Sequence, residues 1–521
     1  MKIALSLVAL VSLAAALQTH AAPSDEQFQK MAGDYIENRL RSHPEGATEL
    51  GDHRFDTQLT DWSAETRAKE LADQKAFLEK LNSFDSAKLT GPNNVDFRIL
   101  KENVEGEIFD LEEMKAAEWN PLVYNQSLAN ALYLLIAREF APPAQKVPAL
   151  RARMEGIPNV IRQAKANLQH CPQIYTETAI EQIQGAIGLV REGLNPVLDR
   201  VPEAKKELAP LQEKTAAALE EYRTWLQNDL LPRSDGDFRI GADKFRKKLH
   251  FSLASDLSVE EVMRRARADL AATQTAIYET ALPLYKKYFP NADQDSLGDK
   301  KKVTTAVLDK LAEQHPNDDT IVGAAEKVLK EATEFTKAKN LVTVYDEPLK
   351  IVVMPEFKRG QGIAYCDSPG ALEKNGETFF AIEPTPASWS QERMDSFFRE
   401  YNDYMVRDLT VHEAMPGHFL QLAHANKFKA PTLVRAIFGS GSFVEGWAVY
   451  AEQFMAEAGY GGPEVRMEQL KMRLRVICNA ILDQSIHTAN MSEQEALDLM
   501  MKEGFQQEGE AVAKWKRARL S

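Results

Sequence analysis

Apolar residues recur every three or four positions along most of the chain, among Glu, Lys, Gln and Ala. This spacing is typical of amphipathic helices that bury one face against their neighbours. Because 521 residues can bury a large core, we predict a large, mostly α fold. The predicted helices span residues 26–42, 61–84, 92–118, 143–170, 176–198, 201–229, 258–288, 300–314 and 318–338, and helical spacing returns from 390 to the end.

Residues 341–383 follow another pattern. β-Branched residues gather at 341–344 and 351–353, and residues 377–382 partly alternate between polar and apolar. Gly and Pro residues separate these runs, as they do between short strands. The segment therefore predicts a small β-sheet of three or four strands.

Turn-forming residues interrupt the helical pattern at 230–236, in the segment LLPRSDG. We predict a domain boundary there. It separates an N-terminal helical region (23–235) from a second region (236–521), which holds the small β-sheet and the functional helices of residues 400–460.

The first 22 residues have the layout of a secretory signal peptide. Lys2 is followed by an apolar run over 3–17, and small residues precede Pro23. The run is shorter than the roughly 20 residues that a membrane span needs. We predict that residues 1–22 direct secretion across the inner membrane to the periplasm or the extracellular space. No Cys follows the run, so we expect neither lipid attachment there nor a stable membrane anchor.

The charge balance limits the partners. Lys and Arg number 63 against 77 Asp and Glu, a formal net charge of −14. Nucleic acids and anionic membranes attract basic surfaces, so we expect no nucleic-acid partner. The three cysteines are too few for a disulfide framework and have no metal-ligand spacing, so we expect three buried thiols. The oligomeric state does not follow from the sequence.

The segment HEAMPGHFLQ, residues 412–421, carries the main chemical signal. Two neutral imidazoles can bind Zn²⁺, and a carboxylate beside the first one can take a proton from water activated by the metal. In the usual zinc motif the two His are four residues apart on one helical face. Here His412 and His418 are six apart, so a straight helix would turn their rings about 120° away from each other.

Pro416 and Gly417 offer a solution, because a Pro inside a helix clashes with the carbonyl four residues earlier, which is that of His412. Gly417 adds backbone freedom. We therefore expect the helix to break at residues 415–417 and to restart at His418. Such a break could bring the imidazole of His418 close to that of His412.

A third ligand is expected from Glu445, which follows a Gly-rich loop at the predicted start of a helix. Its apolar neighbours make burial of an unpaired carboxylate costly, and three protein ligands plus water is the arrangement of a catalytic zinc. Glu452, two turns further on, and Asp408, one turn before His412, are candidates to hold a ligand imidazole in one tautomer. The alternative is that these residues have only a structural role.

These motifs, together with FRIG at 238–241 and the run from Arg475 to His487, resemble the bacterial family labelled domain of unknown function 885. The resemblance covers most of the chain after residue 22. That family is in turn distantly similar to helical zinc peptidases of the angiotensin-converting-enzyme and carboxypeptidase Taq type. The resemblance implies a two-lobed helical fold with a central cleft, His412, His418 and Glu445 as zinc ligands, and Glu413 as the general base.

Family members usually continue past the equivalent of Ser521, through a segment in which a Tyr precedes a Gly. By analogy that Tyr stabilises an oxyanion. We therefore expect either that the chain is truncated at its C-terminus or that another residue supplies the donor. Candidates within the sequence are Tyr365, Tyr401, Tyr404 and His487.

The predicted function is that of an exported zinc-dependent metallopeptidase acting on short peptides, with zinc favoured by the His/His/Glu ligand set. Arg473 or Arg475 could bind a substrate carboxylate, and the strand at 379–382 could pair with an extended peptide. Two alternatives stay open: a catalytically impaired, peptide-binding pseudoenzyme that keeps the metal, and hydrolysis of another amide such as a peptidoglycan cross-peptide.

Overall fold

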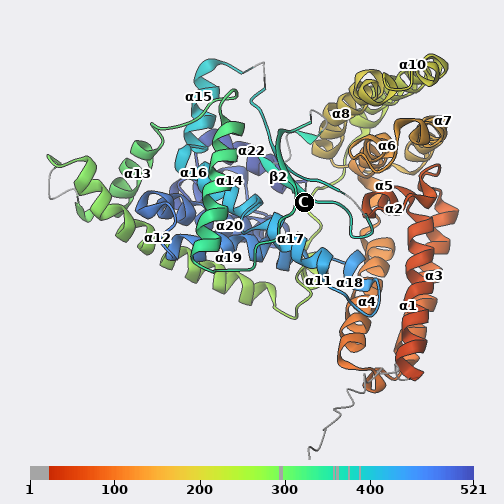
Figure 1. The fold of residues 1–521 in the computed structure, drawn as a ribbon, viewed down its shortest axis with the longest axis horizontal. Coiled ribbons are helices and arrows are strands. Elements are labelled where there is room, and N and C mark those ends of the chain that lie inside the picture. Colours follow the sequence, from red (N-terminus) through yellow and green to blue (C-terminus); the bar gives the residue numbers. More distant parts are fainter. Residues whose placement is uncertain are drawn as a thin grey trace, which may run out of the picture.

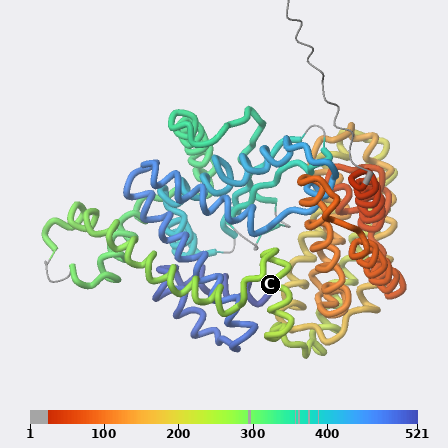
Figure 2. Tube along the Cα trace, turned by 90° about the horizontal axis from the view of Figure 1, so that it is seen from below, coloured from red at the N-terminus to blue at the C-terminus, as the bar shows by residue number. Residues whose placement is uncertain are grey.

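The computed structural model describes residues 23–292, 297–355, 358–359, 363–373, 376–386 and 389–520, so the predicted signal peptide lies outside the described residues. The protein is mostly helical, as predicted, and its helices form two groups that lie side by side (Figures 1 and 2). The N-terminal group contains α1 (Pro23–Ser42), α2 (Pro44–Leu50), α3 (Ala64–Ser83), α4 (Gly91–Phe109), α5 (Ala116–Trp119), α6 (Pro121–Ile136), α7 (Pro143–Asn167), α8 (Gln173–Gly188), α9 (Asn195–Leu198) and α10 (Pro202–Trp225).

The second group follows a segment without α-helix at 231–241, where we predict the domain boundary. It contains α11 (Ala242–Leu253), α12 (Val259–Tyr288), α13 (Lys300–Leu311), α14 (Ile321–Ala338), α15 (Gln391–Glu400), α16 (Asp403–Glu413), α17 (His418–Lys427), α18 (Val434–Ile437), α19 (Gly441–Glu457), α20 (Gly462–Ala489), α21 (Glu493–Asp498) and α22 (Glu508–Ala518). Short 3-10 or π-helical turns extend or connect helices at His53–Phe55, Ser86–Lys88, Asp110–Met114, Leu189–Gly193, Leu226–Leu230, Leu231–Arg233 and Leu499–Glu503.

The sheet has three strands in the described residues: β1 (Leu349–Val353), β2 (Ala364–Asp367) and β3 (Thr378–Ile382). Their order is β1-β3-β2, with β3 parallel to β1 and antiparallel to β2. The prediction of a small sheet is confirmed, but residues 341–344 form no strand. Because β3 has a neighbour on both sides, the prediction that residues 379–382 pair with a peptide is wrong.

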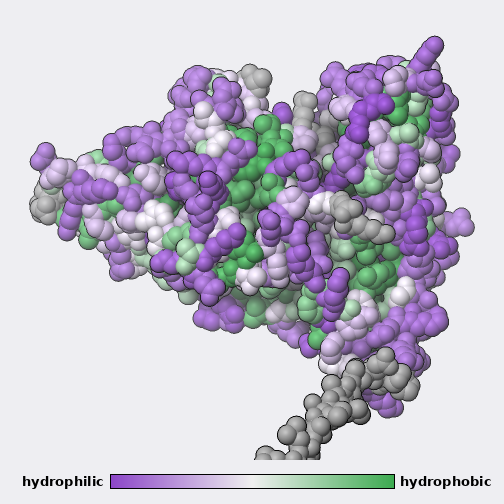
Figure 3. All heavy atoms as spheres, in the orientation of Figure 1, coloured by the Kyte–Doolittle hydropathy of each residue, from purple (hydrophilic) through white to green (hydrophobic). Residues whose placement is uncertain are grey.

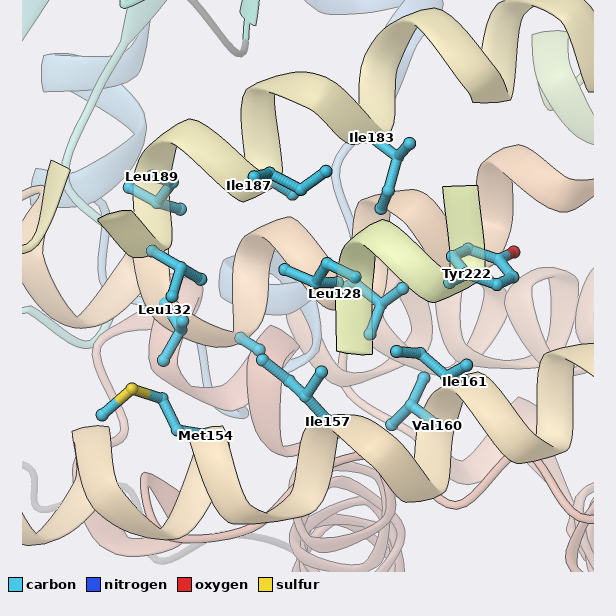
Figure 4. Packing of buried hydrophobic residues seen from close by; sticks show 14 of the residues in the cluster. Leu128, Leu132, Met154, Ile157, Val160, Ile161, Ile183, Ile187, Leu189 and Tyr222 are labelled. Atoms are coloured by element: carbon cyan, nitrogen blue, oxygen red, sulfur yellow. The ribbon is translucent and has the colours of Figure 1, made fainter. Parts of the chain in front are cut away.

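The N-terminal group has two cores, one among α1–α4 and a larger one among α6, α7, α8 and α10. Leu128 and Leu132 of α6 face Ile157 of α7 and Ile187 of α8, and all four side chains are almost fully buried (Figure 4). Burial of a Leu or Ile side chain contributes roughly 1.5–3 kcal/mol, so this cluster stabilises the group strongly.

The second group has two cores. One joins α12, α13, α20 and α22. The other packs the sheet, through Ile351 and Phe380, against α14, α15 and α16, through residues such as Met405 and Leu409. The second core fixes α16 beside β2, which matters for the site described below.

Side chains and backbone connect the two groups. The α4 residue Asp96 pairs with Arg435 and accepts a hydrogen bond from Thr432 at 2.7 Å, and Val434 of α18 packs in the core of α1–α4. At the other edge, Arg138 pairs with Asp367 of β2 at 2.6 Å. The two helical groups are thus tied on both sides of the sheet and α17.

The molecular face in Figure 3 is mostly hydrophilic, with separate hydrophobic patches. Within the described residues, no helix combines the length and the apolarity that crossing a bilayer requires. The three cysteines are free: Cys171 and Cys478 are buried, whereas Cys366 on β2 is half-buried.

Candidate metal centre

Helix α16 carries the first two candidate residues at its C-terminal end. Asn402 caps its N-terminus by accepting hydrogen bonds from the backbone N–H groups of Tyr404 and Met405, at 3.0 and 3.1 Å. The helix ends at Glu413, and α17 begins at His418. The predicted break at residues 415–417 and the restart at His418 are therefore confirmed.

The break replaces the helical hydrogen bonds with a tight turn. The backbone N–H groups of Met415 and Gly417 donate to the carbonyls of Thr410 and Val411, at 3.1 and 2.9 Å. Gly417 is required by close approach, since a Cβ atom there would lie 1.9 Å from the His412 carbonyl oxygen. The Met415–Pro416 peptide bond is cis.

Helix α19 supplies Glu445 from its second turn. Ser440 caps α19 by accepting a hydrogen bond from the Phe443 backbone N–H at 3.2 Å. Trp447, two residues after Glu445, donates from Nε1 to the carbonyl of Pro416 at 2.9 Å. This bond fixes α19 against the turn between the two histidines.

The three predicted ligands come together. One ligand atom each from His412, His418 and Glu445 lies within 4.8 Å of the other two. The Glu445 carboxylate is 3.6 Å from Nε2 of His412 and 3.7 Å from Nε2 of His418. Ligand atoms around a tetrahedral zinc are about 3.3 Å apart, so small adjustments would bring these atoms to one ion.

The ligands differ in exposure. The side chains of His412 and His418 are 17% and 9% exposed, whereas that of Glu445 is 67% exposed. Its neighbour Phe443 also points outward and is 57% exposed, so the Glu445 carboxylate is not enclosed by apolar side chains. The site thus has a buried histidine side and an open carboxylate side.

Glu452 and Asp408 lie behind the histidines, as predicted for positioning groups. Nδ1 of His412 is 2.5 Å from the buried Glu452 carboxylate, which leaves Nε2 facing Glu445. Burial, followed by the charge of Glu452, raises the pKa of Asp408. Such a partner fixes the tautomer and orientation of a ligand imidazole.

Glu413 is buried beside the three ligand residues. Burial, opposed by His412, raises the pKa of Glu413 to about 7. Its carboxylate accepts a hydrogen bond from the backbone N–H of Cys366, so β2 orients it. A carboxyl group whose pKa lies near neutrality can both accept and release a proton under ordinary conditions.

The imidazoles have opposite electrostatic environments. Burial and, to a smaller extent, the neighbouring His412 together lower the pKa of His418 to about 4, although Glu445 acts in the opposite direction. Burial also disfavours charge on His412, but the carboxylates of Glu445 and Glu452 raise the pKa of its ring. His412 in turn lowers the pKa of Glu445. The cluster is therefore one neutral ring and one ring paired with carboxylates, a donor set suited to a dication.

Each of the four candidate oxyanion donors already contacts another part of the protein. The Tyr365 hydroxyl is hydrogen-bonded to Tyr133, Tyr401 is buried and accepts a hydrogen bond from Arg475 at 3.1 Å, and Tyr404 faces Gln314. His487 stacks on Phe245 and its Nδ1 accepts a hydrogen bond from the Ile240 N–H.

The two arginines proposed for substrate binding already have protein partners. Arg473 binds Asp269 through two contacts of 2.9 and 3.0 Å, and Arg475 pairs with Glu510 besides Tyr401. Glu510 also accepts a hydrogen bond from Arg517, so it is shared by two guanidinium groups. That Arg473 or Arg475 holds a substrate carboxylate stays a prediction.

Two contacts at the site were not predicted. The Cys366 N–H is a backbone group, so no residue type could have marked it. Trp447 carries a signal in principle, since a Trp side chain that packs half-buried needs a partner for its N–H. The sequence does not say that this partner is the Pro416 carbonyl, 31 residues away.

Comparisons with known proteins agree with the motif-based resemblance. Residues 44–521 match the family described as bacterial protein of unknown function (DUF885). A solved structure titled "putative lipoprotein of unknown function" from Shewanella oneidensis is 32% identical, with a TM-score of 0.78 over 95% of this chain and 89% of that one.

A second solved structure, a "putative lipoprotein" from Colwellia psychrerythraea, is 16% identical and shares the fold, with a TM-score of 0.75 and the same coverage of 95% and 89%. No curated protein matches the chain. The family match covers the chain from α2 onward and includes His412, His418 and Glu445. The chain therefore belongs to the DUF885 family of bacterial proteins of unknown function.

Proposed function

We propose that this protein is a zinc-dependent metallopeptidase that hydrolyses short peptides. The observation that carries the proposal is the meeting of His412, His418 and Glu445 from three helices, with their ligand atoms within 4.8 Å. Two imidazoles and one carboxylate, with room for water, form the ligand set of catalytic zinc in peptidases. The resemblance to helical zinc peptidases favours the same reaction.

Zinc bound there would supply Lewis acidity to a peptide carbonyl and make a water molecule more acidic. Glu413 would accept a proton from the attacking water and deliver it to the leaving amine. The Cys366 N–H orients the Glu413 carboxylate, and Glu452 orients His412. The exposed side of Glu445 would admit the substrate.

The proposed place of action is the periplasm or the extracellular space. The two solved relatives are titled lipoproteins, which points to the cell envelope for those proteins. The predicted signal peptide of this chain agrees with export. The first Cys of this chain is Cys171, so we propose export without a lipid on that segment.

The test is metal analysis of the purified full-length protein, followed by peptide hydrolysis before and after chelation. We expect about one zinc per chain, loss of hydrolysis with a chelator and recovery with zinc. Glu413→Gln is expected to keep the metal and to lower kcat by 10²- to 10⁴-fold. Glu392→Gln, on the exposed side of α15, is the matched control.

Hydrolysis that survives in Glu413→Gln would exclude the assigned base. His418→Ala should lose the metal, and unchanged zinc content in this variant would exclude the ligand set. Bound zinc without hydrolysis of any peptide would instead support the second candidate, a peptide-binding pseudoenzyme.

A further inference from the structure

A cavity of about 630 Å³ lies between the two helical groups, where α4 and α11 meet the loop that leads into α19. We call it the α4–α11 pocket. Its walls include the aromatic side chains of Phe109, Phe251 and Phe438. Gly439 and Gly441 form the wall nearest α19. The volume is in the range of sites for small ligands or a few peptide residues.

The pocket reaches the same side of α19 as the metal cluster. Gly441 and Glu445 are four residues apart on this helix, so they share one face. Four residues rise about 6 Å along a helix, which is about two residues of extended peptide. A peptide bound at the metal could therefore extend into the pocket within two residues.

Most carboxylates of the pocket already face a basic side chain. Glu107 pairs with Arg39 at 2.7 Å, and Glu102 lies 3.2 Å from His250. Asp110 is the third acid of the wall, and the nearest basic group acting on it is Lys248.

The two basic side chains of the wall are available to a ligand. Among the residues that the structure describes, Arg98 of α4 and Lys248 of α11 form no ion pair or hydrogen bond. Arg98 is exposed and Lys248 is half-buried, so both can turn toward a ligand. The wall carries two basic and three acidic side chains, so the attraction for a carboxylate is local to Arg98 and Lys248 and does not come from the net charge of the pocket.

We propose that the α4–α11 pocket binds a carboxylate of the peptide substrate, two or more residues from the bond that is hydrolysed. The identity of this ligand rests on the proposed peptidase function. Arg98 and Lys248 bind the carboxylate, and the three aromatic rings contact the neighbouring peptide groups. The carboxylate belongs either to an acidic side chain or to the C-terminus of the peptide.

The test is calorimetric binding of four hexapeptides to the full-length protein with the Glu413→Gln substitution. They contain Ala and Gly with either one Glu or one Gln, and each has a free or an amidated C-terminus. We expect the peptides that carry a carboxylate to bind at least tenfold more tightly than the neutral one. Tighter binding of the amidated Glu peptide identifies a side-chain site, and tighter binding of the free Gln peptide identifies a C-terminal site.

Arg98→Gln and Lys248→Gln are each expected to weaken binding of the preferred peptide about tenfold and to leave the neutral peptide unchanged. Lys101→Gln and Lys244→Gln are the matched controls, because they lie on the same two helices outside the pocket wall. The double charge reversal R98E/K248E should favour a Lys-containing peptide.

Equal binding of all four peptides, absence of binding, or an equal loss for charged and neutral peptides would overturn the inference. Binding is read without turnover. If the wild-type protein binds peptides with a carboxylate more tightly but hydrolyses no peptide, only the peptidase proposal is contradicted. If it hydrolyses peptides without this preference, only the assignment of the pocket is contradicted.

Discussion

Among single residues, Glu452 allows an indirect effect on metal affinity to be tested, because it contacts the predicted ligand His412 and is not itself a predicted ligand. It holds Nδ1 of His412 at 2.5 Å and is fully buried. Glu452→Gln keeps the size of the side chain but removes the charge that orients the imidazole. We expect zinc affinity to fall 10- to 100-fold, as for other residues that support metal ligands, when measured by competition with a chelator.

Glu457→Gln on the same helix is the control for this substitution, since its carboxylate accepts a hydrogen bond from Gln453 and lies outside the candidate metal site. Equal zinc affinity in wild type and Glu452→Gln would show that His412 needs no such partner. Unfolding temperatures of both variants would reveal any general destabilisation.

The ligand residues themselves could be predicted, because His, Glu and a Pro-Gly break leave a chemical signature in a short stretch of chain. Their environment could not. The 67% exposure of Glu445 depends on how α19 leans against the turn at 415–417, which Trp447 fixes over a distance of 31 residues. The backbone donor at Cys366 likewise follows from the tertiary arrangement of β2.

At the level of elements, the junction of α16 and α17 depends on Gly417. A Cβ atom there would lie 1.9 Å from the carbonyl oxygen of His412 and 2.3 Å from that of Val411. Gly417→Ala must therefore shift the backbone that positions His412 and His418. We expect at least tenfold weaker zinc binding and a loss of roughly 1–3 kcal/mol in stability, measured by metal competition and by chemical unfolding.

Gly323→Ala is the matched control, because its Cβ would meet no atom within 4 Å and α14 should gain about 0.5–1 kcal/mol from the better helix former. Gly417→Ala protein that binds zinc as tightly as wild type would contradict the role of the close approach.

Periodicity predicted most of the long helices but missed α2, α6 and the amphipathic helix α11. Residues 121–136 contain no charged side chain, and α6 packs against both α7 and α8, so charged residues do not mark a solvent face there. The segment at 341–344 shows the opposite failure. Its β-branched residues favour a strand locally, yet they pack beside α14 without joining the sheet. The local sequence pattern does not determine which other elements a segment packs against.

For the whole molecule, His53 joins the two helical groups. Its ring stacks on Phe140, and its nitrogens lie 3.0 Å from Asp56 and 3.2 Å from Glu373, across 320 residues. Burial disfavours charge on the ring, but Asp56 and Glu373 raise the pKa of His53 overall. A raised pKa stabilises the fold fully below the unfolded-state pKa of about 6.5 and loses this effect as pH rises through the folded-state pKa.

His53→Gln should therefore lower the free energy of unfolding more at pH 5.5 than at pH 9, when both proteins are unfolded with urea. His170→Gln is the control, because that ring is 77% exposed and its pair with Asp235 contributes little. A deficit that stays constant between the two pH values would mean that the charge on His53 does not strengthen the link.

The unequal exposure of the three predicted metal ligands predicts the order in which they would contact an incoming ion. Glu445 reaches solvent, while both imidazoles lie beneath it and one is clamped by Glu452. A dication that enters from solvent would bind first to the Glu445 carboxylate and then to the two imidazole rings. Departure would follow the same route in reverse, so we expect Glu445 to control exchange of the ion and the two histidines to retain it.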